Sequence, residues 1–212
     1  MPFMNQFSQD HLDVLKEVGN IGAGHAATSL SKLLDRKIDM NIPDVRLVSF
    51  NEMMDIAGGA EQVLVSVFLR LEGDVSGSMF FVLPPEQANR MAFQMTGDEK
   101  INFSSPPYSE MGVSAINELG NILSGSYLSA LSDFTNLSIQ PSVPSVSIDM
   151  IGAVLSFGLL ELSQVSDHAI VIDTCIKDNS INSGEVRGHF FLLPDPGSFP
   201  IIFKALGVQD HE

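Results

Sequence analysis

Apolar residues recur at helical spacing in two long segments of the chain. In residues 8–34 they stand three or four positions apart, and the same spacing returns in residues 109–133, after a Pro-Pro pair. Positions three and four residues apart share one face of a helix, so both segments are predicted to be amphipathic helices. Extended runs rich in Val and Phe follow the first helix and predict strands at residues 45–50, 63–72 and 78–83.

Shorter helices are predicted next to these strands. Pro84-Pro85 opens one that ends at Gly97, since proline is accepted at the first helical position. Another covers about residues 147–162, and a last one covers residues 200–206. Helices that alternate with hairpins predict an α+β fold, with an antiparallel sheet packed under helices.

The second half of the chain repeats the first. Identical or similar residues recur at an offset of 101 positions. The matching pairs are Glu17 and Glu118, Gly19 and Gly120, Asn20 and Asn121, Ile21 and Ile122, Gly24 and Gly125, and Pro43 and Pro144. We therefore expect one pseudo-twofold domain over residues 1–212, with repeats at about 8–97 and 108–208. The helix at 147–162 is expected only in the second repeat, where it accounts for that repeat's extra length.

Composition narrows the class of protein. Of the 212 residues, 26 are acidic and 11 are basic, which gives a net charge of −15. So acidic a chain repels phosphate backbones and anionic lipid, so nucleic-acid and membrane-surface roles are disfavoured. The single cysteine, Cys175, cannot form an internal disulfide and reads as part of the core. The N-terminus does not resemble a signal peptide, and the longest apolar stretch is too short to span a bilayer, so we expect a cytoplasmic protein.

The polar residues that the repeats share indicate the chemistry. Glu17 and Asn20 are three positions apart and share one helix face, as do Glu118 and Asn121. Asparagine cannot act as a base but can orient a water molecule, and glutamate can pair with a lysine or activate water. Gly19 and Gly120 remove bulk beside each asparagine, as the close approach of another protein would require. A structural alternative is that asparagine caps a neighbouring element while glycine serves helix packing.

Other chemistries lack the residues they need. The sequence has no evident Ser-His-Asp order and no His-Glu-x-x-His pair, and His25 is replaced by Ser126 in the other repeat. Residues 22–27 match a dinucleotide fingerprint, but a helix pattern precedes them where that motif requires a strand. An enzyme of this composition would position water on a substrate that is already activated. An acyl phosphate carried by a partner with its own metal fits that description.

The complete motif resembles the CheC family of chemotaxis phosphatases, of the CheC, CheX and FliY type. Its pattern is Asp/Ser-x3-Glu-x2-Asn followed, after 22 residues, by Pro. It occurs twice, first as Asp13, Glu17, Asn20 and Pro43, then as Ser114, Glu118, Asn121 and Pro144. The resemblance implies hydrolysis of the aspartyl phosphate of the response regulator CheY. Each asparagine would orient the attacking water, each glutamate would pair with a lysine of CheY, and CheY would supply Mg²⁺. The chain would hold no metal of its own, and both sites would work.

The resemblance also implies a second partner, the receptor deamidase CheD. It would dock on the helix after the second motif proline, with Asp149, Ile148 and Ile151 as contacts. Ile148 and Ile151 also have the spacing of core residues, and both roles are compatible if one face of the helix docks. The alternative function is a non-enzymatic flagellar switch-type module that binds CheY.

Overall fold

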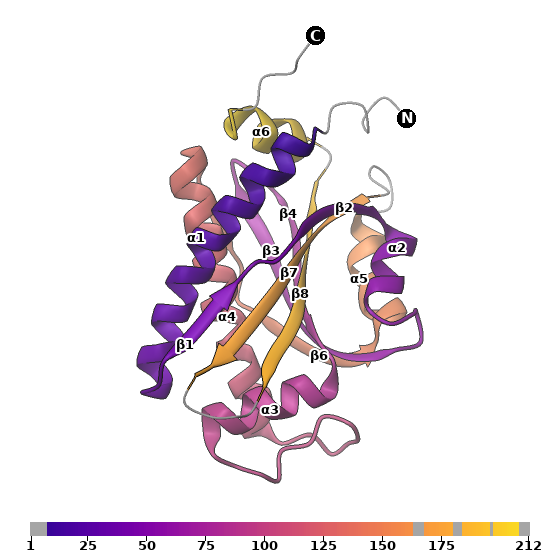
Figure 1. Ribbon diagram of the computed structural model, residues 1–212. Helices are drawn as coiled ribbons and strands as arrows, with labels where there is room; N and C mark the ends of the chain where they lie inside the picture. Colours follow the sequence, from indigo (N-terminus) through magenta and orange to yellow (C-terminus); the bar gives the residue numbers. More distant parts are fainter. Residues whose placement is uncertain (1–7, 163–167, 180–183, 196, 208–212) are drawn as a thin grey trace.

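The computed structural model describes residues 8–162, 168–179, 184–195 and 197–207. Both repeats begin with a long helix, continue through two short strands and a helix, and close with a hairpin and a last helix (Figure 1). The first repeat contains α1 (Gln9–Leu34), β1 (Ile38–Asn41), β2 (Val45–Ser49), α2 (Phe50–Ile56), β3 (Val63–Gly73), β4 (Gly77–Leu83) and α3 (Pro85–Thr96). The second contains α4 (Glu110–Thr135), β5 (Ile139–Pro141), β6 (Ser145–Met150), α5 (Ile151–Leu162), β7 (His168–Asp178), β8 (Glu185–Pro194) and α6 (Ser198–Ala205).

Eight strands of the described residues form one antiparallel sheet in which the repeats exchange their short strands. The strand order is β1-β7-β8-β4-β3-β5, with β2 also on β7 and β6 also on β3. β7 of the second repeat therefore pairs with β1 and β2 of the first, and β3 of the first repeat pairs with β5 and β6 of the second. Neither repeat can complete its half of the sheet without the other. The predicted α+β fold with an antiparallel sheet is confirmed.

Strand side chains alternate between two apolar layers. On one face, residues such as Ile170, Phe81 and Val67 pack under α1, α4, α3 and α6. On the other face, Val171 and Phe191 pack under α2 and α5. The long helices that carry the motif thus lie on one face of the sheet, as the sequence predicts.

α1 and α4 lie against each other and run in opposite directions (Figure 1). Gly22 stands at their contact, where a methyl group on its Cα would come within 2.7 Å of the Tyr127 ring and 2.9 Å of the Tyr127 Cα. Glycine is therefore required there by close helix packing. Each long helix ends at a residue in the left-handed region, Asp35 with φ 49° and Asn136 with φ 55°. Short polar side chains of this type tolerate that conformation.

The first repeat contains a helix that the hydrophobic pattern did not predict. The run at residues 45–50 ends as a strand at Ser49, and α2 follows directly. Ser49 caps α2, because its Oγ accepts from the Glu52 N–H while the Glu52 carboxylate accepts from the Ser49 N–H at 2.8 Å. This is a capping box, and its Ser-x-x-Glu signature is visible in the sequence. A helix after the second short strand is therefore common to both repeats, and α5 is only the longer of the two.

The predicted helix at residues 147–162 begins later than expected. Residues 145–150 form β6, which pairs with β3, so Ile148 and Asp149 lie on a strand and the helix starts at Ile151. The serines and Asp149 alternate with Val146 and Ile148, which are half-buried against the core. This alternation is typical of a strand, and residues 145–150 pair as a strand with the available edge of β3. The pairing decides the structure here, although the spacing of Ile148 and Ile151 would also fit a helix. No helix among the described residues is long and apolar enough to cross a membrane.

Candidate functional site

The first motif lies along the outer face of α1. Asp13 and Glu17 are exposed, and Asn20 is half-buried. The second motif lies on the equivalent face of α4, where Ser114, Glu118 and Asn121 are all exposed. Each helix thus presents a carboxylate and a carboxamide one turn apart, on a surface that a second protein can reach.

The fold explains why the motif proline follows the asparagine after 22 residues. From Asn20 to the end of α1 the chain rises about 21 Å, at about 1.5 Å per residue. The extended return from Lys37 to Pro43 covers about 20 Å, at about 3.3 Å per residue. The two lengths are nearly equal, so the loop between β1 and β2 returns to a place beside Asn20. Residues that are 22 positions apart in sequence are therefore in direct contact.

That contact is a set of hydrogen bonds from the Asn20 side chain to the loop. Its Oδ1 accepts from the Ile42 N–H at 2.9 Å, and its Nδ2 donates to the Lys16 carbonyl at 3.0 Å and, at 3.5 Å, to the Ile42 carbonyl. Ile42 is 2% exposed and packs under Gly19. Asn20 therefore has a structural role, as the alternative interpretation of the sequence allows, and its amide is already engaged.

The second repeat departs from this arrangement. The residue equivalent to Ile42 is Val143, which is 86% exposed. Its neighbour Ser142 is bound to β3, through a backbone bond of 2.8 Å to the Arg70 carbonyl and a bond of 3.0 Å from the Arg70 N–H to its Oγ. Within the described part of the chain, the Asn121 side chain makes no hydrogen bond. The two motifs match in sequence, but only Asn121 has a free carboxamide.

The two glycines next to the asparagines do not face a partner, contrary to the expectation from the sequence. Gly19 and Gly120 are buried and point at the protein's own strands and loops. A methyl group on Gly120 would meet Val67 of β3 at 2.5 Å, and one on Gly19 would meet Ile42 at 3.4 Å. The small size of Gly120 is therefore required for α4 to pack on β3, whereas a methyl group at Gly19 would make only an ordinary contact with Ile42.

A second pair of glycines, to which the sequence pattern assigns no role, lies on the motif face. Gly24 and Gly125 follow the asparagines by four residues, and a methyl group on either would have no atom within 4 Å. Glycine inside a helix costs about 1 kcal/mol relative to alanine. The repeat is the sequence signal for these two glycines, because both copies keep glycine at a position where no internal contact requires it.

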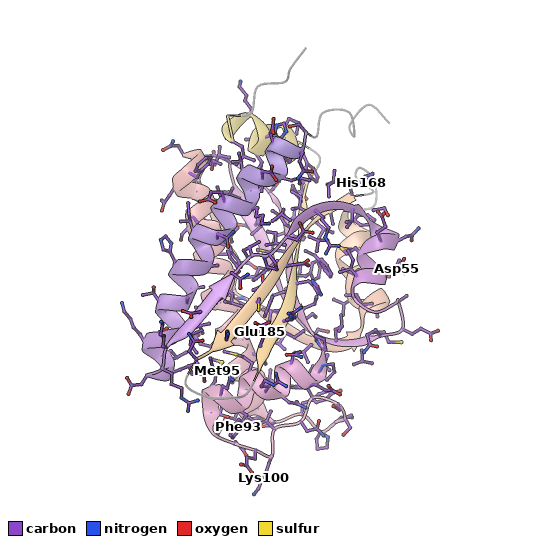
Figure 2. The ribbon with its side chains drawn as sticks, viewed as in Figure 1. Asp55, Phe93, Met95, Lys100, His168 and Glu185 are labelled. Carbon is purple, nitrogen blue, oxygen red and sulfur yellow. The ribbon has the colours of Figure 1, made fainter. Side chains whose placement is uncertain are left out.

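A separate cavity of about 310 Å³ lies on the opposite side of the Asn41–Pro43 loop, over β7 and β8. Charged groups in it are paired, with His189 Nδ1 at 2.7 Å from Asp173 and Arg187 at 3.0 Å from Glu185. Figure 2 shows Glu185 on this open part of the sheet, away from Asp55 on α2. Burial acts to raise the pKa of Asp173, but the hydrogen bond with His189 and the charges of His189 and Arg46 outweigh it and lower the pKa. Asp173 and His189 lie directly opposite each other on β7 and β8, so their pair stabilises the sheet, whereas the exposed Arg187–Glu185 pair within β8 contributes little.

No group of three or more His, Cys, Asp or Glu side chains that could hold a metal ion is present among the described residues. The predicted CheD contacts separate in the structure. Asp149 is exposed on β6, Ile148 is half-buried on the same strand, and Ile151 is fully buried at the start of α5. Ile151 packs in the apolar layer between α5 and the sheet. Asp149 is therefore the one predicted contact of the three that is fully accessible.

Comparisons with known proteins agree on one family. The model of the CheC-like family matches residues 11–46 and 111–148, which include both motifs. The chain is 50% identical to the CheY-P phosphatase CheC of Bacillus subtilis over 209 residues, which cover 99% of this chain and 100% of that protein. It is 28% identical to the flagellar motor switch phosphatase FliY of B. subtilis, over 70% of this chain and 38% of that protein. The crystal structure of FliY from Thermotoga maritima has the same fold, with a TM-score of 0.74, 21% identity, and coverage of 95% of this chain and 96% of that one.

The unequal contacts of the two asparagines predict unequal effects on stability. Asn20→Ala leaves the buried Ile42 N–H without its acceptor, so the free energy of unfolding should fall by about 1–3 kcal/mol. Asn121→Ala removes no bond within the described structure and should stay within about 0.5 kcal/mol of the wild type. Urea denaturation of both variants measures the difference. Equal destabilisation by the two substitutions would contradict the asymmetry.

Proposed function

The chain belongs to the CheC-like family, and on that basis we propose that it is a phosphatase that hydrolyses the aspartyl phosphate of CheY. One observation carries the proposal: two equivalent helices each present a glutamate and an asparagine on an outer face. The B. subtilis relative, which bears the name of a CheY-P phosphatase, supports the choice of substrate.

The proposed reaction is attack of water on phosphorus. The bond between phosphorus and the aspartyl oxygen breaks, so the products are inorganic phosphate and a free carboxylate on CheY. Asn20 and Asn121 enter the active site of CheY, where the carboxamide oxygen accepts a hydrogen bond from the water and holds it in line. The contribution to the rate comes from positioning, because an amide neither gains nor loses a proton at neutral pH.

Glu17 and Glu118 each pair with a lysine of CheY and thereby fix the asparagine one turn further along the helix. The other motif residues shape the surroundings of each Glu/Asn pair. They are Asp13 and Ser114 at the start of each motif, and Pro43 and Pro144 at its end. CheY would supply Mg²⁺, and the chain would act in the cytoplasm. The net charge of −15 assists the encounter with a basic surface.

CheD is proposed as a second partner, at the edge formed by β6 and α5. Asp149, Met150, Ala153 and Ser156 are exposed there, while Ile151 and Leu155 secure the helix on the sheet. Ile148 and Ile151 support this surface from below. α2, the equivalent helix of the first repeat, is 7 residues long against 12 for α5, so the two positions offer different surfaces.

Replacing the asparagines should separate the two sites. We expect Asn20→Ala/Asn121→Ala to lose nearly all activity, because one water-orienting group contributes about 10²- to 10³-fold to the rate at each site. Asn121→Ala should lose more than Asn20→Ala, since the Asn20 carboxamide must first leave Ile42. Phosphate release from phosphorylated CheY is the measurement, with circular dichroism as the control for folding. A folded double variant with near-wild-type activity would refute the mechanism and favour a non-enzymatic switch-type binding module.

Removing the carboxylate charges should weaken the encounter with CheY. Glu17→Gln/Glu118→Gln keeps the shape of both side chains, so we expect a higher KM or a lower rate with intact helices. Added salt should weaken the wild-type encounter more than that of the variant, since part of the attraction is already absent. The measurement is the initial rate against salt and pH. A wild-type turnover that rises through a carboxylate titration at constant affinity would instead assign general-base catalysis to the glutamate.

The CheD surface can be tested by reversing one charge. Asp149→Lys should weaken CheD binding in a titration calorimetry experiment by about tenfold or more, as for a charge at an interface. Asp55→Lys is the matched control, because Asp55 is an exposed acid on α2 and should leave binding unchanged. A similar loss in both variants, or no loss in either, would count against a specific site at β6 and α5.

A further inference from the structure

Gly24 and Gly125 lack any role within the protein's own fold. Both lie inside long helices, neither has a positive φ, and a methyl group on either Cα would find no other atom within 4 Å. Alanine would fit both positions and would be favoured there, since glycine weakens a helix interior. The fold itself therefore gives no reason for glycine at either place.

Three other helical glycines, Gly22, Gly112 and Gly120, have an evident internal reason. A methyl group would come within 2.7 Å of the Tyr127 ring at Gly22, within 2.7 Å of Ile101 at Gly112 and within 2.5 Å of Val67 at Gly120. Each of these residues is buried. The first three glycines make room for neighbouring atoms of this same chain. Gly24 and Gly125 instead leave open space on the surface.

The open space lies on the face that carries the motif. Counting from Glu17, Asn20 is three residues on, Ile21 four and Gly24 seven, which places all of them on one side of α1. Glu118, Asn121, Ile122 and Gly125 repeat the pattern on α4. Ile21 is 43% exposed, so an apolar side chain stands next to the gap. In the first repeat, Gly24 also begins a groove of about 780 Å³ that runs along α1 against β1 to Lys32 and Lys37.

We propose that Gly24 and Gly125 are positioning residues that let phosphorylated CheY seat directly on the helix backbone. The inference rests on the proposed function of the Glu/Asn pairs. A docked surface of CheY fills the space above each glycine, one turn beyond the asparagine. In the first repeat the exposed Ile21 packs beside it. That contact sets how far the asparagine reaches into the active site of CheY. A side chain at the glycine would hold CheY away from the helix.

The test is a substitution that should improve stability and impair the reaction together. Gly125→Ala is made in the Asn20→Ala background, so that only the second site acts, and Gly24→Ala is made in the Asn121→Ala background. Each should raise Tm by about 2–4 °C, because alanine favours the helix. Each should lower kcat/KM for phosphorylated CheY by about 5- to 100-fold, through a lower kcat as well as a higher KM, because the added methyl overpacks a close contact and withdraws the asparagine from the attacking water. Gly125→Leu should lower it further.

Ser29→Ala is the matched control. Ser29 is exposed on the side of α1 opposite Asn20, and its hydroxyl bonds only to the His25 carbonyl of its own helix, at 3.1 Å. It should leave kcat/KM unchanged. A damaged fold cannot produce higher Tm with lower activity, so that pair of results supports the proposal. Higher Tm with unchanged kcat/KM overturns it, and so does a fall in Tm, which would reveal an internal reason for glycine.

The experiment separates this inference from the function on which it rests. If Asn20→Ala/Asn121→Ala is inactive while both alanine-for-glycine variants keep full activity, the Glu/Asn mechanism stands and the role of the glycines is wrong. If the double asparagine variant stays active, the proposed mechanism fails, and the close seating of CheY fails with it.

Discussion

The exchange of short strands between the repeats determines where everything else lies. β7 pairs with β1 and β2, and β3 pairs with β5 and β6, so the edges of each half are completed by the other half. The exchanged strands are also the return paths of α1 and α4, and they fix both helices over one face of the sheet. The outer helix faces, with their glutamates and asparagines, are consequently set by strand pairings between distant parts of the sequence, such as Gly73 with Ile139 and Ile38 with Asp178.

Much of this arrangement can be predicted from the sequence, because the same pattern of residues occurs twice and each copy supports the interpretation of the other. The long helices, the Pro85–Thr96 helix that ends at Gly97, and the shared face of Glu17 and Asn20 all follow from local spacing. The boundary between β6 and α5 could not be predicted in this way, because Ile148 and Ile151 fit a helix as well as a strand followed by a helix. The free edge of β3 decides that case, and a free edge is a property of the assembled sheet.

The unequal state of the two asparagines was also beyond sequence reasoning. Asn20 and Asn121 have the same neighbours along the chain, but Ile42 is buried while Val143 is exposed. The difference arises in the loops, where Ser142 is bonded to Arg70 on β3. Glycine is ambiguous for the same reason. Gly120 is required by packing on Val67, while Gly24 and Gly125 face solvent, and only the three-dimensional surroundings distinguish the two cases.

The opposite directions of α1 and α4 impose a symmetry on whatever binds to them (Figure 1). The acid precedes the amide along each helix, so two molecules of one partner, docked on the two faces, would be related by a half-turn. A contact between two such molecules would be isologous, with the same patch of each meeting its own copy. A charged patch at that position would repel itself, so occupation of one face would lower affinity at the other without any change in this protein's shape. The pseudo-twofold fold thus allows negative cooperativity that originates entirely in its ligands.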